Sequence, residues 1–171
     1  MKLSLSLLIG ILLHHFAAGQ SFFRAEYPAV WQRAAEYTLE VAAAMPADKY
    51  GFAPKNESMS FLGQMVHLVQ NLSFLSGQIT GTRPDFFIGE NPQQISKEKA
   101  TAGLRAAFQH VGGLIQTVDE KTLGEKIKFA GETMTKENIF YLMRDHLTHH
   151  RAQAILYLRL NGIAPPTYRG W

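Results

Sequence analysis

The sequence predicts an all-α protein with the architecture of a four-helix bundle. Three observations support this fold class. Four segments of about 20 or more residues repeat their apolar side chains at helical spacing. Turn-rich stretches separate these segments, and no part of the chain alternates convincingly as a strand. Four amphipathic helices of this length can bury their apolar faces against one another as a bundle, whose core commonly holds metal or ligand sites.

The first two predicted helices are bounded by residues that break helices. The first runs over about 22–45 and ends at Pro46, which opens a turn-rich stretch. The second begins near Ser60 and continues toward Ile79. A second loop follows and extends to Ile95.

The third predicted helix begins at Ser96, whose hydroxyl can accept a hydrogen bond from a free amide of the first turn, and it runs to about Val118. Gly112 and Gly113 fall inside it. Each glycine costs a helix about 1 kcal/mol relative to alanine, so this pair either weakens the helix or marks a close contact with another helix.

The fourth predicted helix covers residues 136–161, with Thr135 as its N-cap and Gly162 at its end. Two prolines follow Gly162 closely, as is common after a helix ends. The short stretch 123–134 between the third and fourth helices is predicted to be a small extended piece or a further turn.

The first 19 residues are typical of a secretory signal peptide. A positive start precedes an apolar run over 3–13, and the small residues 17–19 offer a cleavage site before Gln20. The alternative is a buried first helix of the domain. The apolar run is too short to predict a lasting membrane span.

Cleavage there would leave residues 20–171 as one helical domain, exported in soluble form to the periplasm or the cell exterior. His14 and His15 belong to the removed segment and do not count toward a site.

Composition excludes several kinds of chemistry. The chain has no cysteine, which rules out disulfides, thiolate nucleophiles and cysteine-bound metal, and leaves His, Asp and Glu as the strong metal ligands. The formal net charge is +3, but the lysines and arginines are scattered and form no basic run with interleaved aromatic residues. Nucleic acid is therefore not an expected partner.

The stretch HLTHHRAQ, in the fourth predicted helix, holds three of the seven histidines. His146 and His150 are four residues apart, so their side chains share one helical face with Cβ atoms about 5–6 Å apart, as in the HExxH helix of zinc enzymes. Ile139 and Met143 lie on the same face, which indicates that the pair points into the bundle. His149 lies about 100° around the helix and cannot easily join both on one ion.

Two histidines make an incomplete metal site, since metal centres open to chemistry usually have three protein ligands. The second helix offers His67, in GQMVHLVQN, and the third offers His110, in AAFQHVGG. A single histidine in an amphipathic helix is more often a boundary residue than a ligand, and His149 is expected to be exposed or beside the site. Spacing alone leaves the third ligand open.

Two blocks of the sequence resemble the DinB-like superfamily, also described as DinB/YfiT-type candidate metalloenzymes. The block 45–69, MPADKYGFAPKNESMSFLGQMVHLV, contains the pattern Asp-x-Tyr-x-x-x-Pro, a serine-rich helix start and then a histidine. The block 146–166, HLTHHRAQAILYLRLNGIAPP, is similar to the terminal helix of that superfamily. The resemblance extends over about residues 22–166.

The resemblance implies that His67, His146 and His150 are the three metal ligands. It also implies an up-down-down-up order of helices, for which the loop over 80–95 is long enough to be the crossover, and it makes a homodimer an expectation. Arg151 and Gln153 match the signature of the superfamily without being ligands. Arg151 is expected to be structural and to pair with an acid or a helix end.

Three neutral histidines and a bound water suit zinc or nickel. An ion so held lowers the pKa of the water and polarises a carbonyl, so the sequence favours a metal-dependent hydrolase acting on a small molecule. A general base is not identified, because Asp145 projects away from the histidine face and Glu57 precedes the second helix.

Three alternatives to a hydrolase stay open. The chain could be a non-enzymatic bundle that binds a metal or a partner, or a degenerate member of the superfamily without metal. It could also be a thiol-dependent transferase like cytosolic relatives, although export counts against the use of a cytosolic thiol.

Overall fold

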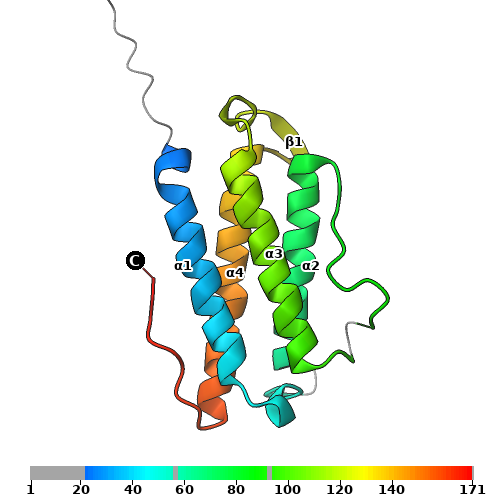
Figure 1. The fold of residues 1–171 in the computed structure, drawn as a ribbon, viewed down its shortest axis with the longest axis vertical. Helices are drawn as coiled ribbons and strands as arrows, with labels where there is room; N and C mark the ends of the chain where they lie inside the picture. The colour runs from blue at the N-terminus through cyan, green and yellow to red at the C-terminus, as the bar shows by residue number, and fades with distance from the viewer. Residues whose placement is uncertain (1–21, 56–57, 92–93, 171) are drawn as a thin grey trace, which may run out of the picture.

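The computed structural model describes residues 22–55, 58–91 and 94–170, and it confirms the predicted four-helix bundle (Figure 1). The long helices are α1 (Phe22–Ala44), α2 (Phe61–Thr80), α3 (Lys97–Thr117) and α4 (Lys136–Leu160). The segment proposed as a signal peptide lies outside the described residues. No helix within the described ranges is long and apolar enough to cross a membrane.

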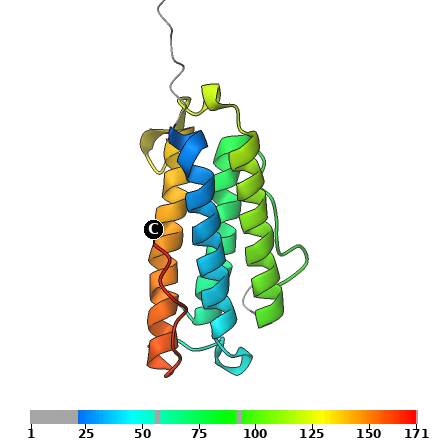
Figure 2. The same ribbon diagram turned by 60° about the vertical axis from the view of Figure 1, so that its left-hand side comes forward.

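The helices follow the up-down-down-up order. Figure 1 shows α2 and α3 running in the same direction, with the connection between them returning along the length of the bundle, while α1 and α4 run the opposite way. Around the bundle each helix packs against two neighbours, α1 against α3 and α4, and α2 against α3 and α4. The second view shows the same parallel alignment, with the C-terminal tail folded back along the bundle (Figure 2). As a result α2 and α4 are antiparallel neighbours, whereas α3 lies diagonally across from α4.

Hydroxyl side chains begin three of the four helices. Ser60, Ser96 and Thr135 cap α2, α3 and α4, and each accepts a hydrogen bond from the amide three residues later, at 3.0, 3.3 and 3.2 Å respectively. Such a bond satisfies one of the amides that the first turn leaves free. The caps predicted at Ser96 and Thr135 are confirmed, and α2 begins directly after Ser60.

Glycines in left-handed conformation end two helices. Gly81 follows α2 with φ of 77°, and Gly162 follows α4 with φ of 72°. After α4 the amide of Gly162 bonds the carbonyl of Arg159 at 3.0 Å and the amide of Ile163 bonds that of Leu158 at 2.9 Å. This pair of bonds is the Schellman arrangement, and it confirms the helix end predicted at Gly162.

Two basic side chains join α1 to α3 by capping the carbonyl end of the opposite helix. Arg24 in α1 donates to the carbonyls of Ile115, Gln116 and Val118 at the end of α3, at 2.8, 2.8 and 2.6 Å. Lys97, the first residue of α3, donates to carbonyls at the end of α1, those of Ala43 at 2.8 Å and Met45 at 2.7 Å. A cation at a helix C-terminus also interacts favourably with the helix dipole. The antiparallel α1–α3 pair is therefore held at both ends.

The connection from α3 to α4 contains a β-hairpin. Strand β1 (Lys126–Phe129) pairs antiparallel with β2 (Glu132–Thr135). The two residues between them, Ala130 and Gly131, have φ of 52° and 86°. Positive φ at both positions is typical of the type I′ turn, whose twist matches that of the paired strands of a two-residue hairpin. The stretch predicted as a small extended piece or a turn is thus both. Two short 3-10 helices, Ala47–Lys49 and Glu120–Thr122, complete the described elements.

The close contact considered for Gly112 and Gly113 is not found at either residue. In α3 it occurs at Gly103. A Cβ at Gly112 would lie 3.8 Å from the ring of Trp31, an ordinary contact, and one at Gly113 would meet open space. A Cβ at Gly103 would lie 2.5 Å from the ring of Phe87, a buried residue of the connection between α2 and α3. Gly103 therefore makes room for the segment that allows α2 and α3 to run parallel.

The two glycines give opposite expectations for alanine. Gly103→Ala should lower the free energy of unfolding by about 1–3 kcal/mol, because the added methyl overlaps the Phe87 ring. Gly113→Ala adds a methyl in open space and should raise it by about 0.5–1 kcal/mol through helix propensity. Urea unfolding of the two variants beside the parent protein measures both values. Equal effects at the two positions would contradict the role given to Gly103.

Candidate metal centre

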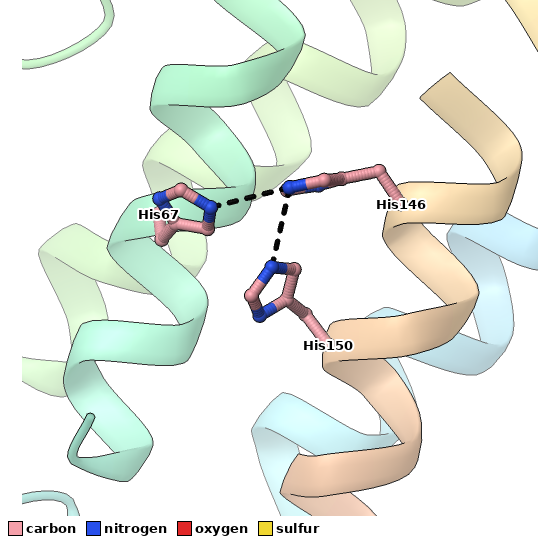
Figure 3. Close-up of side chains that lie close together, drawn as sticks. All are labelled: His67, His146 and His150. Atoms are coloured by element: carbon pink, nitrogen blue, oxygen red, sulfur yellow. Dashed lines mark hydrogen bonds between the residues drawn. The ribbon is translucent and has the colours of Figure 1, made fainter. Parts of the chain in front are cut away.

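Three histidines from two helices meet in the interface between α2 and α4. His67 comes from α2, and His146 and His150 come from α4 (Figure 3). The Nε2 atom of His146 lies 3.2 Å from Nε2 of His67 and 3.2 Å from Nε2 of His150. One donor nitrogen from each ring lies within 4.8 Å of the other two, so the group could hold a metal ion.

The three histidines differ in their burial. Ile139 and Met143, on the histidine face of α4, are fully buried, which confirms that this face points into the bundle. His150 is 8% exposed, whereas His67 and His146 are half-buried. An ion held by the three rings would therefore lie between the apolar core and two half-buried histidines.

The second ring nitrogen of His150 has a protein partner. Its Nδ1 lies 2.6 Å from Oε1 of Gln64, a residue of α2 that is 1% exposed. An amide oxygen accepts only, so Nδ1 carries the proton and the lone pair of Nε2 is free. Histidines that bind metals commonly donate their other N–H in this way. Within the described residues, the buried Nδ1 of His146 has no such partner.

Burial keeps the three imidazoles neutral. Desolvation lowers the pKa of His67 and His146, and for His146 the neighbouring His67 and His149 lower it further. For His150 desolvation, followed by the repulsion expected from the other histidines, lowers the pKa from 6.5 to about 4. At neutral pH each ring therefore presents a free lone pair, as a metal ligand must.

The distances within the cluster suit one tetrahedral ion. With metal–nitrogen bonds of about 2.0–2.1 Å, as in zinc sites, two ligand nitrogens lie about 3.3–3.4 Å apart. The two Nε2–Nε2 separations of 3.2 Å are close to that value. Three neutral nitrogen donors, with no thiolate or carboxylate in the cluster, suit zinc and nickel.

The other histidine candidates lie elsewhere. His110 is half-buried on α3, with its ring centre 5.8 Å from that of Phe86, and it is not part of the cluster. His149 is exposed, as expected, and its Nε2 lies 2.7 Å from Nε2 of Gln153.

Of the two acids considered as general bases, the structure describes one, and it does not join the histidine cluster. Asp145 is exposed and forms an ion pair with Arg144 at 3.2 Å, in agreement with the expectation that it projects away from the histidine face. Glu57 lies outside the described residues.

Arg151 is structural, but its partners differ from those expected. Its buried guanidinium donates to the carbonyl of Ala34 at 3.2 Å and to the hydroxyl of Thr38 at 3.3 Å, and it lies 4.9 Å from the ring centre of Tyr37. These groups belong to the middle of α1 and are neither an acid nor a helix end. A cation over an aromatic ring is favourable where water is excluded, so Arg151 ties α4 to α1.

Gln64 belongs to the site, although the sequence patterns do not predict it. It precedes His67 by three positions and so shares its helical face. A polar residue at a core-facing position of an otherwise apolar helix is a signal that could have identified it. Its partners on α4 could not be inferred from the local sequence.

Comparisons with known proteins agree with this fold and with the resemblance seen in the sequence. A sequence model of the DinB family matches residues 19–170. Nothing among curated proteins matches the chain.

Three solved structures have a similar fold. A DinB-like protein from Bacillus subtilis is 19% identical, with a TM-score of 0.67 over 83% of this chain and 96% of that one. A DinB-like protein from Bacillus cereus is 19% identical, with a TM-score of 0.68 over 81% and 93%. A conserved protein from Enterococcus faecalis is 18% identical, with a TM-score of 0.65 over 78% and 93%.

The lowered histidine pKa values predict that the metal-free protein loses stability as the pH falls from about 6.5 to about 4. The unfolded chain takes up protons on these rings at a higher pH than the folded protein does, so acid favours unfolding. Denaturant unfolding of chelator-treated protein at several pH values measures the loss. His150→Gln removes one of the titrating rings and should reduce the dependence on pH. An unchanged slope in that variant would contradict the prediction.

Proposed function

This chain belongs to the DinB family, and from that premise we propose that it is a metal-dependent hydrolase whose His67, His146 and His150 hold one divalent ion. The observation that carries the proposal is the convergence of three neutral imidazoles from two helices on one region of the α2–α4 interface, where two of the three residues are half-buried. The ion proposed is zinc or nickel, and the substrate proposed is a small molecule.

The histidines and their surroundings would have distinct tasks in this reaction. A divalent ion held by neutral ligands acts as a Lewis acid, which polarises a carbonyl or phosphoryl oxygen and lowers the pKa of a water it binds. Buried His150 keeps one side of the site dry, where electrostatic interactions are stronger. The half-buried His67 and His146 border the side from which a substrate would approach.

The number of protein donors favours a catalytic ion over a structural one. Structural zinc sites almost always have four protein ligands, whereas catalytic sites have three and leave one position for water or substrate. The cluster in the described part of the chain offers three. Three protein donors therefore favour a hydrolase over a bundle that only binds a metal.

A thiol-dependent transferase is the second enzymatic candidate. Three histidines that hold a divalent ion would serve that chemistry as well, because a metal also activates a thiol as thiolate. We rank it lower because we propose that the protein is exported, away from cytosolic thiols. That argument depends on the proposed signal peptide over residues 1–19.

The metal content of untagged protein tests the ligand set. His67→Ala and His150→Ala should each lose the stoichiometric zinc or nickel that the parent protein carries, because two imidazoles hold such an ion far more weakly than three. His110→Ala removes a histidine outside the cluster and should keep it. Elemental analysis after dialysis gives the ratio of metal to protein. Metal retained in His67→Ala would reject the assignment.

Turnover tests the reaction class. Ester, amide and phosphoester substrates should include at least one that the metal-loaded protein hydrolyses at a rate removed by chelation and restored by zinc or nickel. His146→Ala should lower that rate at least about 100-fold, as expected when the electrophile of a hydrolase is displaced. If the loaded protein hydrolyses none of them, the proposal moves to a metal-binding bundle without hydrolase activity.

A further inference from the structure

The contact between Gln64 and His150 is one part of a longer hydrogen-bonded chain across the α2–α4 interface. The Nδ1 of His150 donates to Oε1 of Gln64 at 2.6 Å, and Nε2 of Gln64 donates to Oε1 of Gln153 at 2.6 Å. The Nε2 of Gln153 then donates to Nε2 of His149 at 2.7 Å. Two amides thus connect the buried histidine of the cluster to an exposed histidine that lies outside it.

This chain has a direction. Each amide has a donor end and an acceptor end, so reversing one amide requires the other to reverse too. In the reversed chain Gln64 would donate to Nδ1 of His150, and the neutral ring would carry its proton on Nε2. Only the direction seen here leaves Nε2 of His150 free to face His67 and His146.

We propose that Gln64 and Gln153 are positioning residues that fix the neutral ring of His150 as its Nδ1-protonated tautomer and aim its Nε2 into the cluster. The tautomer is a property of the metal-free protein. Its effect on metal affinity rests on the function proposed above.

Burial gives the arrangement its strength. Gln64 is 1% exposed, so neither end of its amide can exchange its partner for bulk water. A buried amide group left without a partner costs about 1–3 kcal/mol, which disfavours any arrangement that breaks the chain at Gln64. Gln153 is half-buried and links this amide to the surface. In the direction seen here, the tautomer of His150 is therefore held by residues that do not belong to the cluster.

Four variants test the proposal, one of which, Gln153→Leu, removes only the part of the chain beyond Gln64. Gln64→Leu keeps the approximate size of the side chain and removes both of its hydrogen bonds. Gln64→Glu restores an acceptor for Nδ1–H of His150 and serves as the conservative rescue. Gln70→Leu makes the same change at an exposed glutamine of α2 and is the matched control. Circular dichroism and thermal unfolding establish that each variant folds.

The first measurement is the tautomer of His150 in the metal-free protein. Nitrogen-15 NMR of the imidazole rings at neutral pH should show the proton on Nδ1 in the parent protein, in Gln64→Glu and in Gln70→Leu. In Gln64→Leu the ring should exchange between both tautomers, because the amide oxygen that accepts from Nδ1–H is gone. A ring that stays Nδ1-protonated in folded Gln64→Leu would overturn the proposal.

The second measurement is the affinity for zinc alone, by competition with a chelator. Gln64→Leu should bind zinc about 10–100-fold more weakly, the usual effect of removing the hydrogen-bond partner of a ligating histidine. Gln153→Leu should lose less, because Gln64 keeps its bond to His150. Gln64→Glu and Gln70→Leu should stay within about threefold of the parent protein, a change too small to reflect the loss of such a partner.

The two measurements separate this inference from the proposed function. A parent protein that binds neither zinc nor nickel would refute the metal site, and the NMR result would still decide whether Gln64 selects the tautomer. Unchanged zinc affinity in folded Gln64→Leu, beside a parent protein that binds zinc, would overturn the positioning role and leave the metal site standing.

Discussion

The antiparallel packing of α2 against α4 is the constraint on which the site depends. His67 can lie opposite His146 and His150 only if these two helices are neighbours, and the chain makes them neighbours by taking a long connection from α2 to a parallel α3. A simple sequence of antiparallel hairpins would place α2 between α1 and α3, and α4 on the far side of the bundle. The connection is therefore part of what builds the site. Gly103 contributes by allowing Phe87, in that connection, to pack closely on α3.

The burial that positions the histidines also determines their charge. Withdrawal from water disfavours a positive charge on any of the three rings, and a charge on one ring opposes a charge on the next, so the cluster is neutral at physiological pH. The Nε2 atoms of neighbouring rings are only 3.2 Å apart, within hydrogen-bond distance in the metal-free protein, and a cation bound among them would take the place of the shared proton. The same arrangement opposes folding in acid, where each ring would have to stay deprotonated or bring a positive charge into the interface. The histidines that suit a metal therefore lower the free energy of unfolding of the metal-free protein at low pH.

Helix boundaries could be predicted because they depend on neighbouring residues. Ser96, Thr135 and Gly162 act within one turn of their own positions, and each is found where local patterns place it. The third member of the histidine cluster was different, because spacing made His67 and His110 equivalent and the choice came from the resemblance to a family. The fold gives the physical reason for that choice: α2 packs against α4, whereas α3 lies diagonally across from it. The hairpin was not foreseen as such because Ala-Gly is a weak hairpin signal compared with Asn-Gly, and the role of Gln64 depends on partners 86 and 89 residues away.

Consecutive residues of α4 fix the direction in which its histidines point. His150 and Arg151 are both buried and lie about 100° apart around the helix, so one reaches α2 and the other reaches α1. Apolar packing alone tolerates small rotations of a helix about its axis, because it has little directionality. The bonds of Arg151 to Ala34 and Thr38, with Tyr37 against its guanidinium, do have direction, and they restrict that rotation. The position of a helix does not determine which nitrogen of His150 carries the proton. The hydrogen bond to Gln64 does. Buried polar groups on both sides of α4 thus define the orientation of the cluster, and Arg151 contributes to it although it is not one of the three histidines.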